Sequence, residues 1–122
     1  MRLRYIPLVF TAAVMMSLSA SPAFADKRDE ARSQVDFGIN VAQRGLWREA
    51  IYRWEKAVQL DPSYAAAYND LAIAYEHEGQ LEKARKAYDK ALELEPNNTQ
   101  IRQNYDLFKE INDRVAQQKD KR

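Results

Sequence analysis

The sequence contains no cysteine, and its 122 residues include only one histidine, three glycines and four prolines. Without cysteine, the chain has no disulfide framework, no thiolate metal site and no lipid-modified cysteine anchor. A single histidine excludes a multi-histidine metal site, so we expect neither a bound metal nor another cofactor. So few glycines and prolines are unusual for a chain of many short strands and turns. The composition therefore indicates a small helical protein.

An excess of charge of one sign is also lacking. The 19 Lys and Arg residues against 18 Asp and Glu residues give a formal net charge of +1, which excludes the strongly basic footprint of a nucleic-acid-binding protein. Charged residues make up 30% of the chain and hydrophobic residues 46%, so it is neither a disordered polyelectrolyte nor a bundle of membrane helices. A chain of 122 residues has room for one domain.

Residues 1–25 have the pattern of a secretory signal peptide. Two arginines give a positive start, an uncharged run follows over residues 5–18, and small residues stand at Ala23 and Ala25, where a signal peptidase requires them. We expect cleavage after Ala25 and export, to the periplasm in a bacterium or by secretion otherwise. The alternative is an uncleaved membrane anchor. Against it, the uncharged run is shorter than the ~20 apolar residues that cross a bilayer, and Pro7 interrupts it.

A repeat of 34 residues organises the rest of the chain. Seven positions recur at this offset: Gly45, Ala50, Trp54, Ala57, Leu60, Asp61 and Pro62 align with Gly79, Ala84, Tyr88, Ala91, Leu94, Glu95 and Pro96. A fixed period of this length indicates stacked supersecondary units, and apolar residues spaced by three and four within each unit predict two helices. Small residues such as Ala72 and Ala84 leave space for close helix crossings, and Tyr75 and Tyr88 fill the space between layers.

Turn and cap residues predict where the helices end and begin. Gly79 suits the left-handed residue that commonly follows a helix. Ser63 and Asn97 each stand one residue after a proline, so we expect them to cap the helices that follow. Trp47 and Trp54 lie seven residues apart on one helix face, a spacing that is typical of core packing.

These residues resemble the tetratricopeptide repeat (TPR). Residues 65–98 are similar to a near-consensus copy and residues 31–64 to a second copy. The matching positions are Tyr68, Leu71, Ala72, Tyr75, Gly79, Ala84, Tyr88, Ala91 and Pro96 in the former, and Phe37, Gly38, Gly45, Ala50, Trp54, Ala57 and Pro62 in the latter. Gln34 and Val41 depart from the aromatic residues of the motif, which suits a first repeat with no neighbour on its outer side. The resemblance implies an all-α fold, an α-solenoid of two helix-turn-helix repeats.

We expect residues 99–116 to form a capping helix. Its apolar stripe at helical spacing consists of Ile101, Tyr105, Phe108 and Val115, joined by Ile111. Such a helix would cover the flank of the second repeat, because the units of a repeat array bury their apolar faces only against neighbours. Residues 26–30 are then a short N-terminal extension and residues 117–122 a polar tail.

Groups for catalysis are sparse, so we predict no catalytic residues and no enzymatic activity. Glu76, His77 and Glu78 are adjacent, and adjacent residues on a helix do not converge on one ion. We expect His77 to be solvated near a helix end. Three carboxylates precede a cation by four residues, the favourable order for exposed helix pairs: Glu49 and Arg53, Glu82 and Lys86, and Glu110 and Arg114.

The resemblance to TPR proteins implies a concave groove, lined by the first helix of each repeat, that receives a peptide or a partner helix. The groove positions are Arg32, Val35, Asp36, Ile39 and Gln43 in the first repeat, Ala66, Asn69, Asp70, Ile73 and His77 in the second, and Gln100, Gln103, Asn104 and Leu107 in the cap. The family's best-known groove chemistry is a clamp of Lys, Asn and Arg around a terminal carboxylate. It is absent here, because Val35, Ile39 and Asp70 stand at its first positions and Gln100 and Asn104 at its last.

Four apolar groove residues have no expected core role: Val35, Ile39, Ile73 and Leu107. Exposed contiguous apolar surface usually marks an interaction site. We expect these residues to receive an amphipathic helix or an extended segment, with Asn69, Gln103 and Asn104 at its polar edge. The alternative is that residues 26–30 or a dimer contact cover them.

Two functions of different classes follow. The first is a non-enzymatic adaptor or scaffold outside the cytoplasm that binds another protein or peptide of the cell envelope, with no nucleic-acid partner and no stable membrane span after cleavage. The second is a self-associating structural protein whose homo-oligomer is the functional unit. The second stays open because two repeats and a cap are near the lower limit for a stable array.

Overall fold

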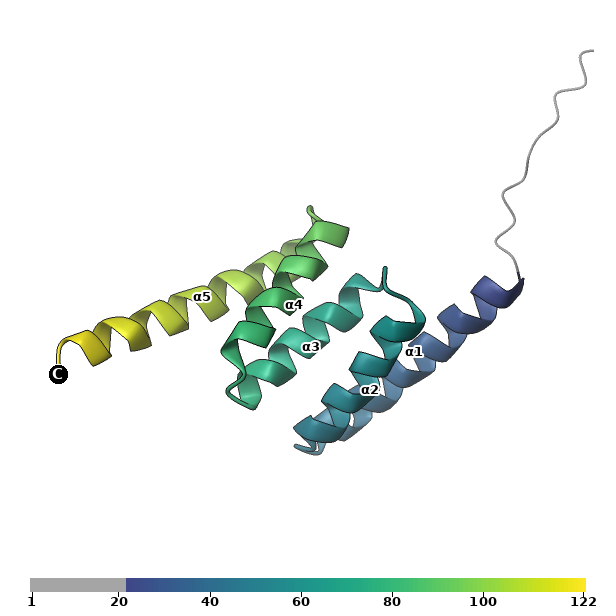
Figure 1. Cartoon of the computed structure of the whole chain (residues 1–122), viewed down its shortest axis with the longest axis horizontal. Coiled ribbons are helices and arrows are strands. Elements are labelled where there is room, and N and C mark those ends of the chain that lie inside the picture. The colour runs from purple at the N-terminus through teal and green to yellow at the C-terminus, as the bar shows by residue number, and fades with distance from the viewer. Residues whose placement is uncertain (1–21) are drawn as a thin grey trace, which may run out of the picture.

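The computed structural model describes residues 22–122 and shows, within them, five α-helices and no strand. The helices are α1 (Pro22–Gln43), α2 (Trp47–Leu60), α3 (Ala65–His77), α4 (Leu81–Leu94) and α5 (Thr99–Asp120). They follow one another across the molecule in chain order, with α1 and α5 at opposite ends (Figure 1). The expected all-α solenoid is confirmed. The expected signal peptide lies almost entirely outside the described residues.

Two helical hairpins correspond to the two repeats: α1 packs against α2, and α3 packs against α4. Each hairpin turns at a glycine with positive φ, +78° at Gly45 and +72° at Gly79. Residues with a Cβ rarely adopt this conformation, so the prediction for Gly79 is confirmed. Contacts of α2 with α3 and of α4 with α5 join the hairpins into one stack.

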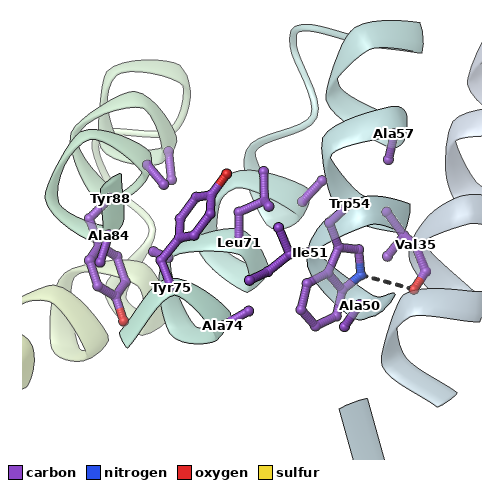
Figure 2. Close-up of a cluster of buried hydrophobic side chains, with 14 of the residues drawn as sticks. Val35, Ala50, Ile51, Trp54, Ala57, Leu71, Ala74, Tyr75, Ala84 and Tyr88 are labelled. Carbon is purple, nitrogen blue, oxygen red and sulfur yellow. Dashed lines mark hydrogen bonds between the residues drawn. The ribbon is translucent and has the colours of Figure 1, made fainter. Parts of the chain in front are cut away.

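The interior alternates small and large side chains, as the repeat predicts. Ala72 and Ala84 are completely buried, and Tyr75 and Tyr88 lie between neighbouring helices (Figure 2). The Tyr75 hydroxyl donates a hydrogen bond to Glu55 Oε1 at 2.6 Å, and the Tyr88 hydroxyl makes the equivalent bond to a glutamate of α3 at 2.5 Å. Burial and these carboxylates raise the pKa of both phenols. The aromatic rings therefore fill the core while their polar atoms stay satisfied.

The first repeat depends on a close approach between α1 and α2. Trp54 is only 3% exposed, and its Nε1 donates a hydrogen bond to the backbone oxygen of Val35 at 3.1 Å (Figure 2). A Cβ placed on Gly38 would lie 2.3 Å from Trp54 Nε1. Gly38 is therefore required by the indole that crosses it, because an interior this dense has no room for a methyl group.

The two predicted N-caps are wrong by one residue. Ser63 Oγ and Ser63 N donate to Asp61 Oδ1 at 2.6 and 3.1 Å, and α3 begins after Tyr64 without a side-chain cap. At α5 the cap is Asn98, whose side chain accepts from the Ile101 amide at 3.1 Å. Ser63 is held in the turn instead, because the short Asp61 side chain accepts hydrogen bonds from its backbone N–H and its hydroxyl.

The first helix is longer than predicted. Residues 26–30 lie inside α1 and do not form a separate extension. Arg28 Nε stands 3.7 Å from Asp61 Oδ2 at the end of α2. These residues therefore reach the turn between the repeats and do not cover Ile39 or Ile73, so this alternative for the groove is not supported.

The last helix covers the second repeat with only its first half. Ile101, Tyr105 and Phe108 are buried, and the rings of Tyr105 and Tyr88 stack with centroids 5.1 Å apart. The expected stripe does not stay buried, because Ile111 and Val115 are 49% and 45% exposed. The helix also runs to Asp120, past the predicted end at residue 116. It extends beyond the stack because α4 has 14 residues and α5 has 22, which is about 21 Å against about 33 Å.

Phe37 of α1 is exposed, although its counterpart in the second repeat is buried. It occupies the position of Leu71, which is 3% exposed, yet Phe37 itself is 47% exposed. The guanidinium of Arg53 lies 4.2 Å from the centre of its ring. In the second repeat, Leu71 is covered by side chains of the first repeat. Within residues 22–122, no helix precedes α1 that could cover Phe37 in the same way.

Candidate peptide-binding groove

A depression of about 370 Å³ opens between α1 and α3. Three helices line it, with Ile39, Ala42 and Gln43 from α1, Trp47 and Trp54 from α2, and Asp70 and Ile73 from α3. Its walls are apolar except for one amide and one carboxylate. This combination of apolar surface with a few polar groups is typical of binding sites.

Helical spacing brings these side chains together. Ile39 stands three residues before Ala42 and four before Gln43, and Asp70 stands three before Ile73, so each set shares one face of its helix. Trp47 and Trp54 are seven residues apart, two turns along α2. Trp54 belongs to the core, whereas Trp47 is only partly buried and adds indole surface to the depression.

Asp70 gives the depression its electrostatic character. Burial raises the pKa of its carboxyl group from 3.8 to about 6, partly offset by a hydrogen bond from Asn69. The ion pairs formed within residues 22–122 do not include Asp70. A partly buried carboxylate in apolar surroundings favours a cation beside it.

His77, at the end of α3, contacts Trp47 at the start of α2. Its ring stacks on Trp47 with centroids 3.8 Å apart and an angle of 8° between the planes. Beside this pair, Arg48 Nε lies 3.3 Å from Glu78 Oε2. His77 is exposed, as expected for a residue near a helix end, and one face of its ring lies against the indole of Trp47.

Val35 and Asn69 are not available as groove contacts, so these two predictions are wrong. Val35 is 4% exposed and packs in the core beneath α2. Asn69 is 8% exposed, and its Oδ1 accepts a hydrogen bond from Asn104 Nδ2 at 3.1 Å. Both amides are used to join α3 to α5 and do not form a free polar edge.

The remaining predicted groove residues divide into two groups. Ile39, Gln43, Asp70 and Ile73 share the depression. The others lie outside it: Arg32 and Ala66 line a separate depression of about 190 Å³, and Asp36, Gln100, Gln103 and Leu107 are exposed elsewhere. Leu107 is 56% exposed but does not line the depression, and Val35 is buried. Of the four predicted apolar side chains, only Ile39 and Ile73 therefore lie together.

Sequence reasoning missed Trp47 as a groove residue. The seven-residue spacing to Trp54 predicted core packing for both. Trp54 is buried in the core, whereas Trp47 is partly buried against it and also lines the depression. The signal that separates them is position: Trp47 is the first residue of α2, where the helix has just emerged from the turn and its side chain has fewer neighbours.

Within residues 22–122, no three His, Asp or Glu side chains are grouped so that they could hold a metal ion. Nor does any helix in this range have the length and apolar character needed to span a membrane.

Comparisons with known proteins agree with the repeat. The tetratricopeptide repeat family matches residues 65–98, and a second TPR repeat family matches residues 42–78. The type IV pilus assembly protein PilF of Pseudomonas aeruginosa is 35% identical over 83% of this chain and 43% of its own. The chloroplastic TPR domain-containing protein PYG7 of Arabidopsis thaliana is 32% identical over 70% of this chain and 28% of its own. The TPR repeat-containing protein YpiA of Bacillus subtilis is 32% identical over 70% of this chain and 22% of its own.

The chain belongs to the tetratricopeptide repeat family, whose repeats form protein–protein interaction modules. The family is generally non-catalytic. The chain spans less than half the length of each of these relatives.

Proposed function

We propose that the chain is an adaptor outside the cytoplasm that binds a helix or an extended segment of a cell-envelope protein in the α1/α3 depression. The observation that carries this proposal is the depression itself, apolar and open, with Ile39 still 39% exposed in the isolated chain. Burying such surface against a partner is favourable by about 25 cal/mol per Å².

The chemistry of the depression narrows the partner. Ile39, Trp47 and Ile73 accept an apolar side chain, and Asp70 at the same wall favours a Lys or Arg next to it. The partner segment is therefore an apolar one with a neighbouring cation. This is the opposite of the terminal carboxylate that the family's clamp receives.

Two observations support the compartment. Residues 1–25 have the pattern of a signal peptide, and one relative is named for assembly of the type IV pilus, a structure of the bacterial cell surface. We propose that the chain acts in the periplasm on a partner of the envelope.

Capture from the envelope tests this function. The tagged full chain is expressed in its host, crosslinked and purified, alongside an Ile39→Glu/Ile73→Glu variant. We expect one discrete partner to be captured by the wild-type chain and lost with the variant, because two carboxylates would be placed on apolar contact surface. Ile73 is partly buried against the core, so its substitution could disturb folding. The single variant Ile39→Glu tests the depression without this risk.

The matched control is Tyr52→Glu/Leu81→Glu, which adds the same charge at exposed positions that do not line the depression. All variants should keep wild-type helicity by circular dichroism. Retention of the partner by both groove variants would refute the proposal.

A second function, self-association, is favoured by the exposed side of α5. Leu107, Ile111 and Val115 are 45–56% exposed and spaced by four residues, so they form one exposed apolar stripe. Sedimentation velocity over a hundredfold range of concentration separates the two functions: a constant monomer supports the adaptor, and a reversible dimer supports the oligomer.

A further inference from the structure

A second depression, of about 410 Å³, lies between α2 and α4 over α3. Its floor is apolar and aromatic, formed by Val58, Tyr68, Leu71, Tyr75 and Ala87. Figure 2 shows Leu71 and Tyr75 of α3 in the space between these two helices. We call this depression the α2/α4 cleft.

The α2/α4 cleft and the α1/α3 depression use opposite faces of α3. Tyr68, Leu71 and Tyr75 line the cleft, whereas Asp70 and Ile73 line the depression. At 3.6 residues per turn these two sets point about 160° apart around the helix axis. A segment bound in one site therefore does not occupy the other.

The rim of the cleft is basic. Lys83, Lys86 and Lys90 are spaced by three and four residues on α4, so their side chains share one face. Among residues 22–122, Glu55 is the one carboxylate that lines the cleft, and it accepts a hydrogen bond from the Tyr75 hydroxyl. Three lysines and one carboxylate thus line the cleft around an apolar floor.

The expected pair between Glu82 and Lys86 does not form. Glu49 with Arg53 and Glu110 with Arg114 are ion pairs as predicted, but within residues 22–122 no carboxylate oxygen is paired with Lys86 at 4.0 Å or less. Lys86 lines the cleft instead. Lys83 Nζ lies 5.7 Å from the Tyr75 ring centre, and Lys90 is paired with Glu93 at the outer edge.

We infer that the α2/α4 cleft binds an acidic peptide segment of a partner protein, one that places an apolar side chain on the floor and carboxylates beside Lys83 and Lys86. Charge complementarity selects the acidic class. The apolar floor selects a polypeptide over a small anion, which gains nothing from the partly exposed side chains of Val58 and Tyr68. The α2/α4 cleft lies between two helices of 14 residues each, which are about 20 Å long. A site of this length matches an elongated segment.

Such a site gives the chain two docking surfaces on opposite faces. It goes beyond the function proposed above, which needs only the α1/α3 depression. A chain with both sites can hold two partners at once, which is what a scaffold requires.

Fluorescence anisotropy with synthetic peptides tests the inference. The probe is a short glutamate-rich peptide with one Phe and one Leu; its controls are the same peptide with Gln for each Glu, and with Ser for Phe and Leu. With the full chain we expect saturable binding of the probe, weakened by 0.5 M salt, and a loss of about tenfold or more with either control peptide.

Variants locate the site. Lys83→Glu/Lys86→Glu should weaken probe binding by about tenfold or more, whereas Lys119→Glu/Lys121→Glu, an equal charge change at the exposed end of the chain, should not. Ile39→Glu should leave probe binding unchanged, so this site is separable from the groove. Equal binding of the Gln peptide, equal loss in both lysine pairs, or binding only to phosphatidylglycerol vesicles would each overturn the inference.

Discussion

The carboxylate of Asp70 lowers the stability of the isolated chain at neutral pH. Its pKa is raised to about 6 by burial, so between about pH 4 and 6 the folded chain retains a proton that the unfolded chain has released. A group that is protonated more in the folded state makes the free energy of unfolding fall as pH rises through this window. The cost is then fully present at pH 7, where a partner's cation can relieve it.

Replacement of Asp70 by its neutral isostere should therefore stabilise the chain. We expect Asp70→Asn to raise the free energy of unfolding by up to about 3 kcal/mol at pH 7 and by almost nothing at pH 4, because each unit of pKa shift corresponds to about 1.4 kcal/mol and the shift is about two units. Urea denaturation at pH 4, 5.5 and 7 measures this difference. An equal effect of the substitution at all three values would show that charge is not its cause.

Gly38 allows the close crossing of α1 and α2 because it has no side chain. Gly38→Ala would normally stabilise a helix by up to about 1 kcal/mol. Here we expect destabilisation by about 1–3 kcal/mol, because the new Cβ would lie 2.3 Å from Trp54 Nε1.

Chemical denaturation of a double-mutant cycle tests the role of Gly38. In a Trp54→Phe background the smaller ring leaves room at the crossing, so Gly38→Ala should cost less there than in the wild-type chain. If the alanine costs the same in both backgrounds, the indole is not the obstacle.

At the scale of elements, the repeat period made most of the fold predictable. A 34-residue offset together with small and large residues at fixed positions defines α2, α3 and α4, and the structure confirms the turn glycine Gly79. Helix starts were less predictable. Ser63 and Asn97 are residue types that often cap helices. The Ser63 hydroxyl instead donates to the Asp61 side chain in the turn, and the cap of α5 is Asn98, one residue closer to the helix.

The site was less predictable than the fold. The groove positions came from the family pattern, which places Val35 and Asn69 on the concave face but says nothing of neighbours in this chain. Val35 is buried under α2, and Asn69 is taken by Asn104. Such outcomes depend on the distances between helices, which a one-dimensional spacing does not contain.

The two halves of α5 should contribute differently to stability. Phe108 is 1% exposed and lies against Tyr88 and Tyr105, so Phe108→Ala should cost about 3–5 kcal/mol. Deletion of residues 111–122 removes side chains that are mostly exposed and should change the free energy of unfolding by less than about 1 kcal/mol.

Thermal unfolding followed by circular dichroism compares the two changes at low protein concentration. If the deletion is as damaging as Phe108→Ala, the far half of α5 is packed in solution, either on the chain itself or on a second copy. Repeating the measurement at high concentration distinguishes these cases, because only association makes the midpoint depend on concentration.

At the scale of the whole molecule, three surfaces of the described helices are candidate docking sites. These are the α1/α3 depression, the α2/α4 cleft and the stripe along the end of α5. The first is apolar with one carboxylate, the second apolar with three lysines, and the third apolar alone. Because their chemistry differs, we expect each surface to bind a different class of occupant. Substitutions confined to one surface should therefore affect only the occupant of that surface.

The most direct test of the central claim is site-specific photo-crosslinking in the host. A photoreactive phenylalanine analogue replaces Gln43, which lines the α1/α3 depression and is exposed, or Tyr52, which is 56% exposed and does not line it. We predict a discrete crosslink to a different envelope protein from position 43 and none from position 52. Crosslinks from position 43 only to a second copy of the chain, or the same products from both positions, would contradict the claim that this depression holds another polypeptide.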